Sequence, residues 1–230
     1  IVNVAVPDVM GAFGVGLDQA QLMTSAFNIA MVTSQLLSAW LVSAFGQRGG
    51  FLLMSLVFVV GSVIAGLGQD FNLIVVGRVL QGGAAGVIQP PVMVVAFQVF
   101  PTDRRGYAMA IYSMGVFLAV AVGPIIGGVA IDLLEWRYIF WAPLPVIGVA
   151  ALMGWIFMPS VRNKDSGPFD WPGYLLLLVC VYCLITGLTE GNREGWTSTY
   201  ILGLFALGLG SGIVRIIPQL PDGPTLLDPP

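Results

Sequence analysis

The chain has 230 residues, of which 57% are hydrophobic and only 9% carry a charged side chain, and its mean hydropathy is +0.91. Soluble domains usually contain about a quarter charged residues, so this is not the composition of a soluble domain. The net charge of −3 and the few scattered basic residues argue against nucleic acid as a partner. The sequence has no histidine, the commonest general base and metal ligand, and we predict neither an enzyme nor a metal site.

Apolar runs of about 20 residues, the length that a helix needs to cross a bilayer, recur along the whole chain. We therefore predict an all-α integral membrane fold. In chain order the expected spans are 1–13, 22–45, 51–67, 73–97, 107–131, 139–158, 173–189 and 200–217. The sequence opens on IVNVAVPDVM, which is already apolar, and we interpret it as a fragment whose first span is truncated.

These spans divide the chain into four expected parts. A six-span bundle occupies 1–158, and a cytoplasmic loop follows at 159–172. Two additional spans lie within 173–217, and the chain ends in a polar, proline-rich tail at 218–230.

The basic residues predict the orientation of the spans in the membrane. The loops after the second, fourth and sixth spans contain Arg48, Arg104, Arg105, Arg162 and Lys164, whereas the loops after the odd-numbered spans contain only Arg137 and Arg193, with six of the twelve acids. Lys and Arg favour the cytoplasmic side of a membrane, and acids count for little in this rule. From the basic residues we therefore expect the even-numbered loops and the N-terminus to be cytoplasmic, in a multi-pass protein of the cell membrane.

Arg78 is the most informative single residue, because it lies about two turns inside the fourth span. An arginine at the centre of a span costs about 2.5–3.5 kcal/mol on insertion scales, so it should face a bundle interior or a wet cavity. Gln81 lies beside it on the helix, and Asn3 is a polar residue within the first span. We predict that these three residues belong to a translocation or proton pathway. The alternative is an arginine that reaches the outer headgroups.

Small residues recur at helical spacing in two spans. Gly82 and Gly86 in the fourth span, and Gly123 and Gly127 in the fifth, are spaced to let helix backbones approach closely. Pro124 cannot donate a helical hydrogen bond, so we expect a bend or a weak point there, near the external end of the fifth span. We predict that the stretch GPIIGG, which ends at Gly128, packs or gates that end, with ordinary helix packing as the simpler interpretation.

Several stretches resemble signatures of the major facilitator superfamily. AVAVGPIIGG is similar to the proline–glycine signature of the fifth span in its proton-driven antiporters, and RVLQGGAAG is similar to its fourth-span signature. IVNVAVP resembles the first span of the drug:proton antiporters with fourteen spans, and FDWPGYLLLL followed by EGNREGW resembles the extra helix pair of that group. In the loop after the second span, Gly46 and Arg48 are kept, but Ser43 stands where an acid is typical and Ala44 where a base is typical.

The resemblance implies a fold and a function. The fold is a major facilitator helical bundle, with one six-helix half followed by two linker helices, and the arginine linked to proton coupling falls on Arg78. The intact protein is then an antiporter that exports drugs or amphipathic toxic compounds and uses the proton gradient, without a cofactor. Its expected partners are the lipid bilayer, protons and a small amphipathic substrate, and participation of a periplasmic adaptor is left open. Two alternatives remain: a superfamily transporter of a specific metabolite such as an amino acid or siderophore, and a non-transporting membrane scaffold or channel component.

Overall fold

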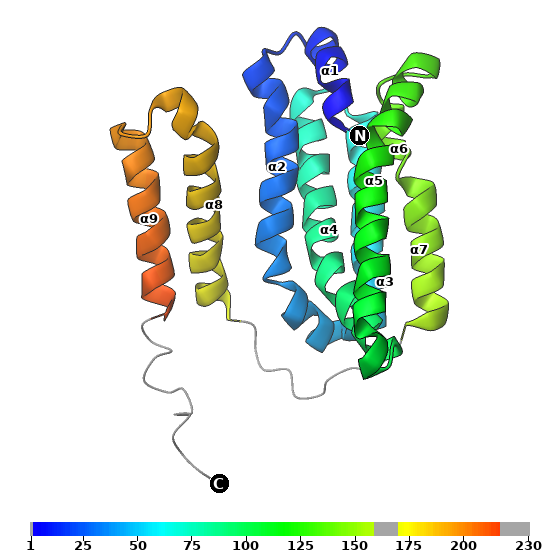
Figure 1. Cartoon of the computed structure of the whole chain (residues 1–230). Helices are drawn as coiled ribbons and strands as arrows, with labels where there is room; N and C mark the ends of the chain where they lie inside the picture. The colour runs from blue at the N-terminus through cyan, green and yellow to red at the C-terminus, as the bar shows by residue number, and fades with distance from the viewer. Residues whose placement is uncertain (1, 159–169, 217–230) are drawn as a thin grey trace, which may run out of the picture. The chain divides into compact units, whose positions relative to one another are not determined.

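The computed structural model describes residues 2–158 and 170–216, and every regular element in them is a helix. The α-helices are α1 Val6–Phe13, α2 Leu17–Gln35, α3 Ser38–Leu67, α4 Phe71–Val99, α5 Arg105–Leu133, α6 Tyr138–Trp141, α7 Leu144–Phe157, α8 Trp171–Glu194 and α9 Thr199–Ile216 (Figure 1). Short 3-10 helices, η1 Val2–Ala5 and η2 Thr102–Arg104, precede α1 and α5. Most of the expected loop at 159–172 and all of the tail at 218–230 lie outside the described residues.

The chain separates into two compact units, Ile1–Ser166 and Gly167–Pro230, which we describe one at a time. Five helical segments of the described residues are long and apolar enough to cross a membrane: Ser38–Leu67, Phe71–Gln98, Thr102–Leu133, Tyr138–Phe157 and Trp171–Glu194. Thr199–Val214 is a shorter apolar helix. The predicted all-α membrane fold is therefore confirmed.

The second expected span, 22–45, contains a break that the sequence did not predict. The second span was expected to continue to residue 45, but α2 ends at Gln35 and a new helix begins at Ser38. The expected loop around Gly46 is instead a kink inside α3, where Gly46 has φ 76° and ψ 164°. A positive φ is accessible to glycine at little cost because it has no Cβ. The chain therefore turns sharply at Gly46 without a loop between helical segments.

The turns of the first unit alternate between its two ends. The connections after α1, α3 and α5 lie at one end, and those after α2 and α4, together with the C-terminal end of α7, lie at the other (Figure 1). Asp18, Asp70 and Glu135 belong to the first end, and Arg104 and Arg105 to the second. The acidic and basic residues from which the orientation was predicted therefore lie at opposite ends of one bundle. We refer to these ends as the acidic end and the basic end.

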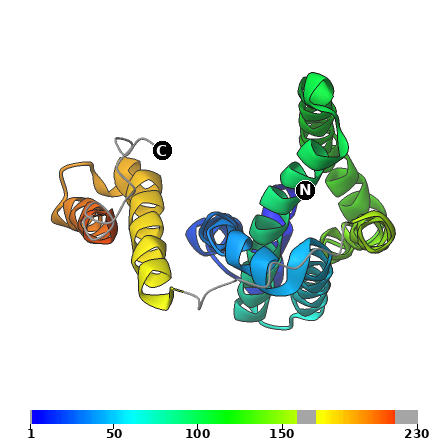
Figure 2. The ribbon, with the colours of Figure 1, turned by 90° about the horizontal axis from the view of Figure 1, so that it is seen from below.

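The helix α4 packs against both α2 and α3 (Figure 1, Figure 2). It runs parallel to α2 with a constant offset: Arg78 meets Met23, Gly82 meets Phe27, Gly86 meets Met31 and Gln89 meets Gln35. These pairs are 54 or 55 residues apart in the chain. A spacing of three or four residues keeps side chains on one helix face. One face of α4 is thus matched turn by turn to one face of α2.

The acidic end of the first unit contains an apolar core. Its buried members come from η1, α1, α2, α3, α4 and α6: Ala5, Val9, Met23, Ala65, Ile74, Ile139 and Phe140. Aromatic rings extend this core, because Trp136 makes edge contacts with Phe13 and Phe140 at centroid distances of 5.7 and 6.4 Å. Packed apolar side chains therefore lie at the acidic end, and two of them, Ile139 and Phe140, line the same pocket as Arg78.

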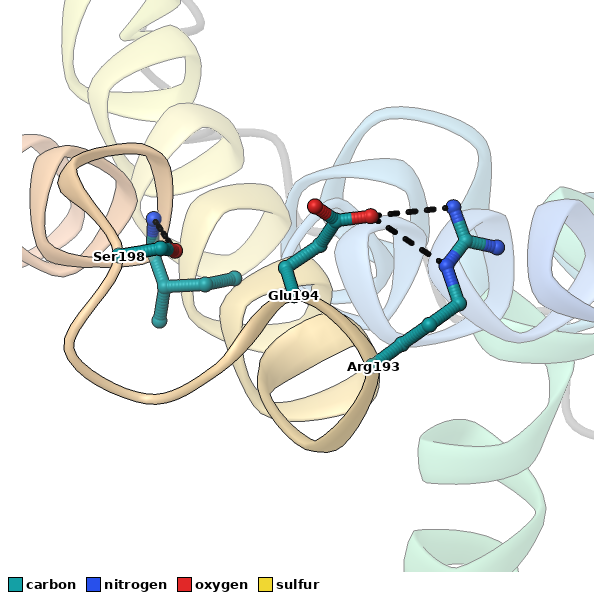
Figure 3. A network of polar contacts seen from close by, with 4 residues as sticks. Arg193, Glu194 and Ser198 are labelled. Atoms are coloured by element: carbon teal, nitrogen blue, oxygen red, sulfur yellow. Dashed lines mark hydrogen bonds and ion pairs between the residues drawn. The ribbon is translucent and has the colours of Figure 1, made fainter.

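The second unit is a helical hairpin of α8 and α9. Asp170 caps α8, since its carboxylate accepts a hydrogen bond from the Gly173 backbone N–H at 2.9 Å. Ser198 caps α9 in the same way through the Ile201 N–H, and Arg193 pairs with Glu194 at the preceding turn (Figure 3). Such capping oxygens satisfy N–H groups that have no partner within the helix. Ser198 and Asp170 thus fix where the two helices of the hairpin begin.

The cysteines of this hairpin lie at its helix contact. A Cβ added to Gly208 would lie 3.3 Å from the Cys183 Cβ, and one added to Gly212 would lie 3.2 Å from the Cys180 Sγ. Both thiols are free. Their packing fits small apolar side chains that fill the space beside glycines.

Candidate translocation site

Arg78 is buried in the first unit, with 7% of its surface exposed. Its Nη1 donates to the Gln81 Oε1 at 2.8 Å, and its Nε donates to the Met23 carbonyl of α2 at 3.3 Å. Its Cζ lies 4.1 Å from the centroid of the Phe27 ring. The guanidinium is therefore held by neutral acceptors and an aromatic face. This placement contradicts the alternative of an arginine that extends to the headgroups.

Gln81 connects Arg78 to a third helix. Its Nε2 donates to the Ser62 Oγ of α3 at 2.6 Å, while its Oε1 accepts from Arg78. Gln81 and Ser62 are both fully buried, with 1% and 0% exposure. Buried polar groups of this kind are costly unless they are paired. The hydrogen bond from Gln81 to Ser62 therefore links α4 to α3. The hydrogen bond from Arg78 to the Met23 carbonyl links α4 to α2.

A pocket of about 350 Å³ lies against this network. Arg78, Gln81, Thr24 and Asn28 supply its polar lining. Its apolar lining comes from three aromatic rings and three aliphatic side chains: Phe27, Phe58, Phe140, Val2, Ile139 and Pro143. Mostly apolar walls with a few placed polar groups are typical of small-molecule sites. Sequence reasoning had identified Arg78 and Gln81 but not Thr24, Phe58 or Ser62. Thr24 and Ser62 could have been found as small polar residues within apolar helices, whereas Phe58 carries no such signal.

A second pocket lies nearer the basic end. It is apolar, has a volume of about 400 Å³ and shares Phe58 with the first pocket. Gln89 lines it, and the Gln35 Nε2 donates to the Gln89 Oε1 at 3.0 Å. Tyr112 of α5 faces the same pocket. The first pocket is therefore lined by a charge and polar groups at Arg78, whereas the lining of the second pocket is apolar with one neutral amide pair.

The glycines predicted to pack α4 do so against α2. A Cβ on Gly82 would lie 2.9 Å from the Phe27 carbonyl carbon, and one on Gly86 would lie 2.8 Å from that of Met31. A Cβ on the intervening Gly83 would meet no atom within 4 Å. The position of each glycine on the helix, rather than glycine content, therefore decides which positions exclude a side chain.

A second pair of glycines, which sequence reasoning missed, joins α4 to α3. A Cβ on Gly61 would lie 2.8 Å from the Gly77 carbonyl oxygen, and one on Gly77 would lie 2.6 Å from that of Gly61. Gly77 directly precedes Arg78 and sets the distance at which α3 approaches the arginine. Both glycines are visible in the sequence as small residues within spans, but the sequence does not show that their two helices are neighbours.

The GPIIGG stretch lies within α5. Gly123 and Gly127 are buried there, together with Ala108 further back, whereas Pro124 is exposed and Gly128 is intermediate. A Cβ on Gly128 would meet no atom within 4 Å, so the structure gives this glycine no close neighbour among the described residues. The helix also continues unbroken through Pro124, which loses one helical hydrogen bond but does not end the helix.

Two of the remaining predicted residues, Gly46 and Arg48, lie apart from this pocket. Gly46 and Arg48 are in α3 near the basic end, where Arg48 stacks 5.6 Å from the Trp155 ring centroid. Asn3 lies in η1, next to the pocket residue Val2, but the structure does not describe the Asn3 side chain. Within residues 2–158 and 170–216, no three Asp, Glu, Cys or His side chains gather as a metal site would require.

Comparisons with known proteins place this geometry in a family. The model described as Major Facilitator Superfamily matches residues 1–219. The chain is 30% identical to the multidrug export protein EmrB of Haemophilus influenzae, covering 99% of this chain and 45% of that protein. It is 31% identical to the multidrug transporter protein MdtP of Bacillus subtilis, covering 94% and 40%. The chain thus spans less than half the length of these relatives.

A solved structure supports the fold. The crystal structure of PepTSo, a transporter of the POT family, matches with a TM-score of 0.62 over 97% of this chain and 51% of that one. Sequence identity is 17%, so the likeness extends to the helical architecture alone.

Proposed function

The chain belongs to the major facilitator superfamily, and we propose that the intact protein is a proton-coupled antiporter that exports drugs or amphipathic toxic compounds across the cell membrane. The observation that carries this proposal is Arg78, a buried charge on the wall of a largely apolar pocket. Intramembrane charges are costly and are retained mainly at ion and substrate pathways. Relatives named as multidrug export and transport proteins support the substrate class.

Arg78 suits proton coupling for a physical reason. Positive charge near an acid favours the ionised form of that acid, so movement of either group changes the acid's proton affinity. The proton-carrying acid is proposed to lie in the part of the transporter beyond this chain. Gln81 would hold the guanidinium in place, and Asn3 is proposed to lie on the same path. The proton gradient supplies the energy, and no cofactor is required.

The site belongs to a multi-pass membrane protein, and its further setting is part of the proposal. The basic end is proposed to face the cytoplasm, since Lys and Arg favour that side. Alternating access would then rock this half against a second half around a midplane site. The bilayer, protons and the exported compound are the proposed partners. A non-transporting scaffold is disfavoured by family membership and by the charged pocket.

The central experiment uses the full-length protein in proteoliposomes with an imposed pH gradient. We expect drug transport that dissipates the gradient, and Arg78→Ala should abolish active transport while leaving insertion intact. Arg78→Lys should retain partial activity, because the point charge survives but the planar fork is lost. Arg193→Ala, at an exposed turn, is the matched control and should transport normally. Wild-type drug gradients in Arg78→Ala would contradict the coupling role.

Orientation is tested by thiol labelling in intact cells after Cys180 and Cys183 are replaced. Cysteines introduced near Arg104 should be protected from an impermeant external reagent, and those near Asp70 or Asn192 should be labelled. Labelling of both sets from outside would contradict the proposed cytoplasmic position of the basic end.

A further inference from the structure

We infer that the pocket at Arg78 selects small amphipathic anions, with a carboxylate or similar head and an aromatic body. This inference rests on the proposed transport function and assigns a substrate class to its site. Arg78 is the one lining residue with a formal charge at neutral pH among the described residues of the two pockets.

Within the described structure, none of the groups that contact Arg78 compensates its positive charge. The acceptors that hold it are the Gln81 amide oxygen and the Met23 carbonyl, and the third contact is the face of Phe27. These groups satisfy hydrogen bonds and orient the guanidinium, but none carries a negative charge. A charge surrounded by apolar groups acts over a longer distance than it does in water. An anion that entered the pocket would gain this attraction, and a cation would be repelled.

The rest of the pocket suits the body of such a ligand. Phe27, Phe58 and Phe140 contribute aromatic surface, while Thr24 and Asn28 of α2 supply neutral hydrogen-bonding groups. A volume of about 350 Å³ lies at the lower end of the range for small-molecule sites. Arginine is also the side chain best shaped to bind a carboxylate through two parallel hydrogen bonds. The geometry therefore joins an anion-binding head to an aromatic slot.

The test measures equilibrium binding to the full-length protein in lipid nanodiscs. The probes are naphthylacetate and naphthylethylammonium, which share an aromatic body and carry opposite charges, and empty nanodiscs correct for partition into lipid. We expect the anion to bind at least about 10-fold more tightly, a factor that corresponds to about 1.4 kcal/mol. Equal affinity, or preference for the cation, would overturn the inference.

Two variants locate the preference at this site. Arg78→Gln removes the charge, and Gln81→Glu places a carboxylate beside it at nearly unchanged volume, so each should abolish the anion preference. Arg48→Gln, a charge change at the basic end outside the pocket, should leave it unchanged. If Arg78→Gln does not fold, Gln81→Glu and the wild-type ratio still decide. A preference that persists in the folded variants would overturn the inference.

The result is independent of coupling, because binding needs no proton gradient. Anion preference without proton-driven transport would contradict the antiport proposal and leave the anion site standing. Proton-driven transport without anion preference would do the reverse.

Discussion

The helices α4 and α5 have similar length and composition but opposite packing. In α4, 44% of the most apolar window is buried within the described structure, whereas in α5 the figure is 11%. The glycines Gly77, Gly82 and Gly86 of α4 touch neighbouring backbones. Along α5, large side chains such as Phe117 and Ile125 remain 73% and 67% exposed.

This difference indicates what each helix does. The central helix α4 carries the charged network and is held at a fixed distance from α2 and α3. Among the described residues, α5 buries only the small residues Ala108, Gly123 and Gly127, and its Tyr112 lines the second pocket. Its remaining apolar surface is exposed, and we propose that it faces lipid or the second half of the transporter. Similar glycine motifs therefore bring α4 into contact with two neighbouring helices, whereas in α5 they form one small buried face on a mostly exposed helix.

The largest expected effect is on the contact between α4 and α2. Gly86→Val would drive a branched side chain into the Met31 backbone and should destabilise the protein by about 3 kcal/mol, the upper end of typical overpacking costs. Thermal unfolding in detergent measures the loss. Gly83→Val is the matched control, because a Cβ there meets no atom within 4 Å. Equal destabilisation by both variants would mean that valine disturbs the helix itself rather than the contact.

The buried polar network should give the next largest effect. Gln81→Leu removes the partner of both Arg78 and Ser62 and should cost about 2 kcal/mol, because unpaired buried groups carry their full desolvation cost. Gln89→Leu removes an exposed amide pair, so its unfolding midpoint should stay near wild type. A larger loss for Gln89→Leu would reverse the assigned order of the two sites.

The glycines of α5 should show a smaller stability effect with a functional consequence. Gly127→Val should cost about 1 kcal/mol, the lower end of overpacking costs, since α5 is loosely packed and can shift. If the motif seals the external gate, this variant will leak protons or favour the outward-open state in vesicles of the full-length protein.

Gly128→Val is the matched control for that gate. A Cβ at Gly128 meets no atom of the described structure within 4 Å, so its proton leak should match wild type. Leak in Gly128→Val alone would place the gate contact on the other side of α5, toward the second half. Normal leak in both variants would reduce the motif to ordinary packing.

The smallest effect is expected at Pro124. Its ring is exposed and α5 passes through it unbroken, so Pro124→Ala should change stability by less than about 0.5 kcal/mol, as at other surface positions. Efflux and proton uptake should be measured together, because a role in helix bending predicts weaker coupling with normal insertion. Unchanged coupling would leave the proline without a functional role.

The sequence by itself determined the membrane class, the alternating charge of the two ends and the position of Arg78 inside the bundle. These conclusions rest on the cost of placing polar groups in a bilayer, which depends on each residue and its position along a span. Gly82 and Gly86 were recognised for a similar reason, since their spacing places them on one helix face. The resemblance to the superfamily, which was stated on short motifs, was confirmed over residues 1–219.

The tertiary structure decided what those residues touch. Helical spacing does not say which helices are neighbours. The register of α4 on α2 and the Gly61–Gly77 contact were therefore not predictable from the sequence. Nor did spacing distinguish Gly127, which is buried, from Gly128, which has open space beside it. The kink at Gly46 was read as a loop because polar and glycine residues are typical of both. The partners of Arg78 come from α2 and, through Gln81, from α3, and contacts between distant segments of a chain exist only once its helices have packed.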